Sequence, residues 1–387
     1  MSSALPTLNG EWLQHGAHRA RWLPDGVSAI NAVLDAIREA RQSVCFECYI
    51  IRPDGPGEAL RSTLLAAAQR GVQVSVLHDA FGCEGLPADF FDALRSAGGE
   101  VRCFSPSRSL RAAMRDHRKL LVCDGRLGIV GGFNIGPEYY GDGINEGWFD
   151  LGLQISGPVV QDMQRGFDAM FALAPLTPRA LQKFRRRVAG PEPALTDVML
   201  LQRGLGWPGG RLRGALHRDL RQGRLVCCMA AYFLPSARIR RELANCRRRG
   251  GSVQLLLAGL SDVPISKFAS EHLYSRLMRA GVEVWEYQPQ ILHAKLLIID
   301  DVVYAGSCNL DRRGLYINYE LLLRVQWPAL AAQGRQLFAA ALSHSQQCAL
   351  REWRQRSWWQ RWRSVCAYWV VSRLDPLVAR RGMRSLG

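Results

Sequence analysis

Residues 117–134 read HRKLLVCDGRLGIVGGFN, and residues 293–309 read HAKLLIIDDVVYAGSCN. In both stretches one residue separates a histidine from a lysine, an aspartate follows, and a glycine-containing segment then ends in an asparagine. The surrounding sequence repeats as well, because the end of a helical stretch, an Arg-Gly stop and an apolar run precede the motif in each half. This self-similarity indicates one structural unit written twice.

Each motif predicts a strand, a tight turn and a returning strand. Side chains two positions apart on a strand point to the same face, so the histidine and the lysine of each motif share a face. Asp124 and Asp300 stand in turn-like pairs, after which an apolar run brings the asparagine back beside the histidine and the lysine. We interpret both aspartates mainly as turn residues, although they belong to the motif and are kept among the candidate catalytic residues.

Strands that alternate with helices in both halves predict an α/β fold with mixed, largely parallel sheets. We place the first αβ(α) domain at residues 20–175 and the second at residues 196–345. A linker rich in Pro and Arg separates them at residues 176–195, and a basic, Trp-rich tail follows at residues 346–387.

The composition is that of a globular protein with an anionic partner. The 387 residues include 50 Lys and Arg against 34 Asp and Glu, which gives a formal net charge of +16. Such an excess suits nucleic acid, anionic lipid or a phosphorylated substrate. The eleven cysteines are scattered without paired spacing, which is typical of reduced thiols. We expect no signal peptide and no membrane-spanning segment, because no apolar run reaches the roughly 18 residues required.

The paired motifs carry the residue types that phosphodiester chemistry needs. One histidine can attack phosphorus and form a covalent phosphohistidine, while the other protonates the leaving oxygen and then deprotonates the incoming hydroxyl. Lysine and asparagine side chains would hold the non-bridging oxygens. This chemistry requires no metal ion and no other cofactor. The candidate catalytic residues are His117, His293, Lys119, Lys295, Asp124 and Asp300, and the candidate phosphate-binding residues are Asn134 and Asn309 with the same two lysines.

Two carboxylates downstream of the motifs are candidates for orienting the histidines. A histidine that attacks phosphorus works best when an acceptor holds its far ring nitrogen. Asp150 and Glu320 each stand at the start of an apolar, strand-like run, and we expect them to supply these acceptors. Glu47 has no counterpart in the second half, so it either pairs with a lysine or arginine or lies near the cleft.

The duplicated motif resembles the signature of the phospholipase D superfamily over residues 20–345. Residues 131–134, 152–160, 230–235, 309–311 and 318–320 resemble bacterial cardiolipin synthases of the short type more closely. The resemblance implies two pseudo-symmetric domains that share one active site at their interface. It also implies phosphatidyl transfer from phosphatidylglycerol to the hydroxyl of a second phospholipid, with release of glycerol.

The resemblance further implies roles for individual residues. By family precedent His117 is the nucleophile and His293 is the general acid and base, although the pseudo-symmetry would allow the reverse. Gly314 departs from the family pattern, because relatives often carry serine at this position. A phospholipid hydrolase, a nuclease and a non-catalytic binding scaffold remain as alternatives.

The tail favours a lipid partner over a nucleic acid. Trp358, Trp362, Val365 and Trp369 are spaced to share one helical face, and arginines fall largely elsewhere. Such a helix suits the interface of an anionic membrane. The alternative is a helix that packs on the second domain and exposes its arginines. We therefore expect a peripheral protein on the cytoplasmic face of the inner membrane, with an anionic phospholipid surface and phospholipid substrates as partners.

Overall fold

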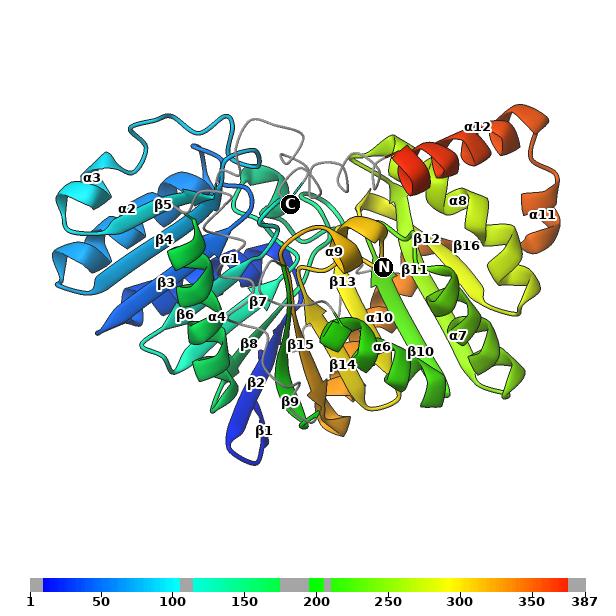
Figure 1. Ribbon diagram of the computed structural model, residues 1–387, viewed down its shortest axis with the longest axis horizontal. Helices are drawn as coiled ribbons and strands as arrows, with labels where there is room; N and C mark the ends of the chain where they lie inside the picture. The colour runs from blue at the N-terminus through cyan, green and yellow to red at the C-terminus, as the bar shows by residue number, and fades with distance from the viewer. Residues whose placement is uncertain (1–9, 105–113, 175–194, 205–209, 375–387) are drawn as a thin grey trace, which may run out of the picture.

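The computed structural model describes residues 10–104, 114–174, 195–204 and 210–374. Two halves lie side by side, and each is built on an eight-stranded sheet with helices packed against it (Figure 1). The predicted linker at residues 176–195 falls outside the described residues except for its last position. Within the described residues, no helix is long and apolar enough to span a membrane.

The first half alternates strands and helices as predicted, reaches the motif hairpin and then continues to a further strand and helix. Its elements are β1 (Leu13–His15), β2 (His18–Leu23), α1 (Gly26–Glu39), β3 (Ser43–Cys48), α2 (Pro56–Gln69), β4 (Gln73–Asp79), α3 (Asp92–Ser96), β5 (Glu100–Phe104), β6 (Leu120–Cys123), β7 (Leu127–Gly131), η2 (Pro137–Tyr139), β8 (Gly152–Ser156) and α4 (Val159–Leu173). The sheet order is β1-β2-β8-β7-β6-β3-β4-β5.

The second half repeats this order and adds the tail. Its elements are β9 (Val198–Arg203), α6 (Gly210–Gln222), β10 (Leu225–Ala230), α7 (Ala237–Arg248), β11 (Ser252–Leu260), α8 (Pro264–Arg279), β12 (Glu283–Ile291), β13 (Lys295–Ile299), β14 (Val302–Gly306), α9 (Arg312–Tyr316), β15 (Glu320–Gln326), α10 (Pro328–Ser343), β16 (Ser345–Gln347), α11 (Leu350–Arg354), α12 (Trp358–Trp369) and the π-helical turn η3 (Val370–Leu374). The sheet order is β16-β12-β11-β10-β13-β14-β15-β9.

The α/β class with two pseudo-symmetric halves is confirmed, but the expectation of largely parallel sheets is wrong. Among the strands that the structure describes, only the β3-β4-β5 and β10-β11-β12 pairs run parallel. The motif hairpins β6–β7 and β13–β14 are antiparallel, and so is the following strand of each half, β8 or β15. A tight turn can join only antiparallel neighbours, so each motif hairpin gives its half of the fold this mixed character.

Helices α4 and α10 pack across the interface and join the two sheets in one core. The indole N–H of Trp22 on β2 donates to the carbonyl oxygen of Leu330 on α10 at 3.1 Å. Phe167 and Met170 of α4 belong to the same buried cluster as Leu323 of β15. Because this apolar core spans both halves, it fixes the motif of one half against the other.

Candidate active site

The start of each motif is held by the backbone of the opposite half. The N–H of His117 donates to the carbonyl oxygen of Tyr319 at 3.1 Å, and the N–H of His293 donates to the carbonyl oxygen of Phe149 at 2.8 Å. Each acceptor directly precedes a carboxylate residue in the sequence, Glu320 in one case and Asp150 in the other. The docking of the halves therefore sets each histidine beside a carboxylate that the other half supplies.

Both histidine rings contact these carboxylates through Nδ1. His117 Nδ1 lies 3.0 Å from Glu320 Oε1, and His293 Nδ1 lies 2.6 Å from Asp150 Oδ2. All four residues are buried. A carboxylate on Nδ1 fixes the ring orientation and leaves Nε2 as the nitrogen available for chemistry. The structure thus brings together the residues that the sequence singled out as histidines and orienting groups, and it pairs them crosswise.

The two motif lysines lie buried against their own histidines. Lys119 Nζ donates to the carbonyl oxygen of His117 at 2.8 Å, and Lys295 Nζ lies 3.1 Å from His293 Nδ1. Burial lowers the pKa of Lys119 to about 8, and burial also lowers the pKa of Lys295. Because the site buries two ammonium groups, an anion bound between them would stabilise both in the charged form.

The two histidines experience different electrostatic environments. Burial, together with Lys119 and Lys295, lowers the pKa of His117 well below its usual value. Burial and Lys295 also lower the pKa of His293, but the adjacent Asp150 carboxylate opposes this shift. Burial raises the pKa of Glu320 to about 8. His117 is therefore held as a neutral imidazole near pH 7, whereas the cationic form of His293 has a carboxylate partner that favours it.

The asparagine side chains that end the motifs are buried, and not all of their polar atoms are hydrogen-bonded. Asn134 Oδ1 accepts from the N–H of Ile50 at 3.1 Å. Within the described residues, Asn134 Nδ2 and Asn309 Oδ1 are buried without a hydrogen bond of normal geometry. Lys295 and Asn309 also line the same small cavity. Unpaired polar atoms at equivalent places in both halves indicate positions where a ligand could bond.

The structure does not bring Asp124 and Asp300 beside the histidines but places both in the turns, as the interpretation of them as turn residues predicted. Strand β6 separates Lys119 from Asp124 by about 16 Å of extended chain. The Asp124 carboxylate accepts from the N–H groups of Gln42 and Ser43 at 2.7 and 2.9 Å, which fixes the start of β3. Asp300 caps β10 through the N–H of Leu225 in the same way. Both aspartates adopt positive φ, as the predicted turns require.

Sequence reasoning missed several groups that shape the site. Ser307 Oγ donates to Glu320 Oε2 at 2.5 Å and accepts from the N–H of Leu321, so it anchors the carboxylate that holds His117. The only sequence signal is the Gly-Ser in the second motif, where the first motif has Gly-Gly. Aromatic rings also border the histidines. The ring centroids of Tyr49 and His117 lie 4.9 Å apart, and those of Trp148 and His293 lie 5.6 Å apart.

Glu47 pairs with an arginine, which was one of the two expected outcomes. Arg118 Nη2 lies 3.1 Å from Glu47 Oε2, and both side chains are almost completely buried. Arg118 also donates to the carbonyl oxygen of Gly166 on α4 at 3.3 Å. The pair lies directly behind the first motif, because Arg118 stands between His117 and Lys119.

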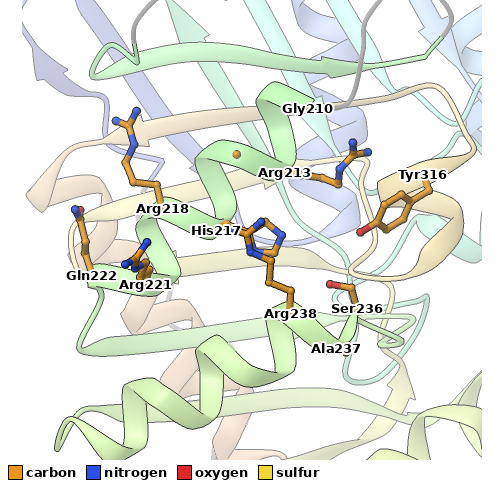
Figure 2. Close-up of a pocket in the computed structure, with 11 residues that line it drawn as sticks. Gly210, Arg213, His217, Arg218, Arg221, Gln222, Ser236, Ala237, Arg238 and Tyr316 are labelled. Carbon is orange, nitrogen blue, oxygen red and sulfur yellow. The ribbon is translucent and has the colours of Figure 1, made fainter.

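Two larger hollows lie outside the histidine site, on the second half. One, of about 880 Å³, runs between α6 and the start of α7, and its walls carry Arg213, Arg218, Arg221 and Arg238 (Figure 2). The other, of about 970 Å³, is lined by the starts of α7 and α8, by α9, by Tyr368 and by residues 370–373 of the tail. The two hollows share three residues, so they adjoin.

The fold and the paired histidine-lysine motifs define a member of the phospholipase D superfamily. The family described as "Cardiolipin synthase, PLD-like domain" matches residues 33–171 and 217–342, and the chain belongs to this family. Cardiolipin synthase A of Pseudomonas putida strain F1 is 33% identical over 321 residues, which cover 79% of this chain and 64% of that protein. The chain thus spans just under two thirds of the length of this relative.

A second relative and one solved structure extend the comparison. Cardiolipin synthase A of Pseudomonas fluorescens strain Pf-5 is 31% identical over 353 residues, which cover 87% of this chain and 71% of that protein. The crystal structure of phosphatidylserine synthase from Haemophilus influenzae Rd KW20 superimposes with a TM-score of 0.74. It covers 95% of this chain and 96% of that chain at 15% sequence identity, which establishes the shared fold.

Proposed function

We propose that the chain is a phosphatidyltransferase that makes cardiolipin. It would transfer the phosphatidyl group of one phosphatidylglycerol to the hydroxyl of a second phospholipid and release glycerol. The observation that carries this proposal is the crosswise pair of histidines, each held by a carboxylate of the other half. The names of the relatives support the choice of a lipid substrate.

The first chemical step forms a covalent intermediate on His117. Its pKa is lowered, so the ring is neutral and its Nε2 lone pair can attack the phosphorus of phosphatidylglycerol. The bond from phosphorus to the glycerol oxygen breaks, and this oxygen takes a proton from Nε2 of His293. Asp150 stabilises the imidazolium form of His293 before that transfer.

In the second step, His293 accepts a proton instead of donating one, and the bond between phosphorus and His117 breaks. The neutral His293 takes the proton of the acceptor hydroxyl, whose oxygen attacks phosphorus and displaces His117. Cardiolipin leaves, His293 is again protonated and His117 is again free. Charge on the non-bridging oxygens is stabilised in both steps by Lys119 and Lys295, with the asparagine side chains Asn134 and Asn309 beside them.

The location of this reaction is also a proposal. All eleven cysteines are free, and most are buried, which fits a reducing compartment. Phospholipid substrates require access to a bilayer. We infer a peripheral protein at the cytoplasmic face of the cell membrane.

The experiment that tests the function is incubation of the purified chain with phosphatidylglycerol vesicles, with a chelator and without added metal, followed by mass analysis of the lipids. Cardiolipin and glycerol are the expected products, and the His117→Ala variant should form neither. Phosphatidic acid alone would make the chain a phospholipid hydrolase. The absence of any lipid product would favour a nuclease, with the arginine-lined hollow of Figure 2 as its candidate phosphate track.

A further inference from the structure

Helix α12 turns its large apolar side chains away from the protein. The exposed fractions are 63% for Trp358, 60% for Trp359, 57% for Trp362, 48% for Val365 and 56% for Trp369. These five are half of the ten large apolar residues that are exposed in the described part of the chain. An exposed apolar patch this dense in one helix marks a contact surface.

The opposite face of α12 attaches the helix to α8 through small and polar groups. Ala367 is buried, and Ser364 Oγ donates to Glu271 Oε2 at 3.2 Å. The Tyr368 ring packs 4.6 Å from the ring of His272. A helix covering a core in water normally buries its large apolar residues and exposes its polar ones. Here the order is inverted, so the outer face is built for a partner that is not water.

The charges near this face identify the partner. Arg351, Arg354, Arg361 and Arg363 are exposed on α11 and α12. Glu352 is the single acid on these two helices, and Glu271 of α8 is buried and already paired with Arg356 at 3.0 Å. Tryptophan at an interface with arginine beside it matches the boundary of a bilayer that contains anionic lipid.

The position of α12 also connects its outer face with the active site. Figure 1 shows the helix along the upper edge of the second half, with its C-terminal end directed toward the junction of the halves. That end continues into Val370–Arg373, which line the 970 Å³ hollow together with Tyr232. The Tyr232 hydroxyl donates to Asp262 at 2.7 Å, and the charge of Asp262 acts on His293. The end of the tail therefore shares a hollow with Tyr232, whose partner Asp262 is close enough to His293 to act on its charge.

We propose that the outer face of α12 docks the chain on an anionic phospholipid bilayer, with its tryptophans in the interfacial layer. The hollow beside η3 then opens toward the lipid. This inference rests on the proposed function for its purpose, because docking would deliver substrate to the histidines. The docking itself can be measured without any turnover.

The first test is flotation of the full chain with vesicles of phosphatidylcholine, with or without phosphatidylglycerol. The test variant carries Trp358→Gln, Trp362→Gln and Trp369→Gln, since glutamine retains helix propensity. The matched control is Trp12→Gln, a tryptophan next to β1 on the first half. We expect binding to phosphatidylglycerol vesicles to fall at least about tenfold in the triple variant and to stay unchanged in the control.

A second measurement uses the unaltered chain. Lipids brominated near the headgroup should quench part of its tryptophan fluorescence in phosphatidylglycerol vesicles, and quenching should be lost in the triple variant. Equal binding by the triple variant and the unaltered chain would overturn the proposal. So would a vesicle-free dimer that the triple variant abolishes, because the face would then be a self-association surface.

Turnover separates this proposal from the proposed function. On short-chain phosphatidylglycerol dissolved as monomers, the triple variant should react as fast as the unaltered chain, while on vesicles it should be at least about tenfold slower. If the unaltered chain converts neither substrate, the proposed function fails and the flotation result still decides the docking. If the triple variant loses both activities equally, α12 acts on the active site rather than on the membrane.

Discussion

The two halves share one motif but surround it differently. His117 faces Glu320, which Ser307 and Asn318 also hold, whereas His293 faces Asp150, which accepts from its neighbour's N–H at 2.8 Å. A repeated unit therefore supplies the same reactive groups twice, and the residues around them give each copy its own proton affinity. This difference supports the proposal that His117 is the nucleophile and His293 the general acid and base.

The first half combines the shorter acid, Asp150, with the smaller motif residue, Gly132. A Cβ added at Gly132 would lie 2.4 Å from Asp150 Oδ1, so a serine like Ser307 could not stand there. Asp150 lacks one methylene relative to Glu320 and approaches the backbone of the first motif more closely. Gly132 with Asp150 in one half, and Ser307 with Glu320 in the other, are thus two sterically compatible combinations.

The region behind the histidines differs as well. Glu47 and Arg118 form a buried ion pair in the first half. In the second half, the equivalent strand and motif positions carry Met229 and Ala294. One half therefore retains buried charge where the other is apolar. Replacing the Glu47–Arg118 ion pair by its apolar counterpart tests whether the ion pair serves stability or chemistry.

The largest expected effect comes from removing either histidine. His117→Ala and His293→Ala should each lower turnover of phosphatidylglycerol by about a thousandfold or more, because neither half can replace the other. Rates from product mass, with thermal unfolding as the check on folding, measure this. If either variant retained more than about a tenth of the activity, the division of labour would be contradicted.

The next effect concerns stability. Arg118→Ala should lower the free energy of unfolding by about 3–5 kcal/mol, because it leaves Glu47 buried without its partner. The double variant Glu47→Met with Arg118→Ala recreates the apolar pair of the second half and should recover most of this loss. Urea denaturation measures both, and Arg165→Ala, at an exposed ion pair, is the matched control. A double variant as unstable as the single one would show that the pair is not replaceable.

The orienting carboxylates should have intermediate effects. Glu320→Gln and Asp150→Asn are each expected to lower kcat by about 10- to 100-fold, because the imidazole loses the acceptor on Nδ1. Ser307→Ala should cost less than Glu320→Gln, since it removes only a support of the carboxylate. Steady-state kinetics on short-chain phosphatidylglycerol separates kcat from KM. Equal losses for all three variants would argue against this order.

The smallest effect is a shift of the pH profile. The pKa of Lys119 is lowered to about 8, so its ammonium loses a proton above that pH and phosphate binding should weaken there, in addition to the loss of the His293 proton at lower pH. Lys119→Arg keeps the positive charge and should move the alkaline limb upward by about one pH unit or more. The acid limb should lie below pH 6.5, because the pKa of His117 is lowered. Lys267→Arg, on α8, is the control, and an alkaline limb that does not move would contradict the role of Lys119.

The sequence predicted the duplication and indicated which residues the structure gathers at the interface, because both depend on local patterns. A strand, a turn and a returning strand can be recognised within eighteen residues, and the asparagine follows from that geometry. The crosswise pairing of His117 with Glu320 could not be predicted, because it depends on how two segments more than 200 residues apart dock. The same holds for Ser307, whose hydroxyl matters only because Glu320 lies above it.

The strand directions in the sheets and the packing of the tail show a second limit of prediction from the sequence. Alternating strands and helices favour parallel pairing, but the number of tight hairpins decides the actual balance. For the tail, tryptophan and arginine are both amphipathic, so their spacing defines a face without saying which face packs. The small residues Ser364 and Ala367 decide it, because they allow α12 to approach α8 closely.

The most direct test of the division of labour is to trap the covalent intermediate. A phosphatidyl ester of nitrophenol needs no proton for its leaving group, so the His293→Gln variant should complete the first step and lack the base for the second. Mass analysis of peptides prepared at alkaline pH should then find the phosphatidyl group on His117. The His117→Gln variant should carry none. A phosphatidyl group on His293 in the His117→Gln variant would contradict the assignment.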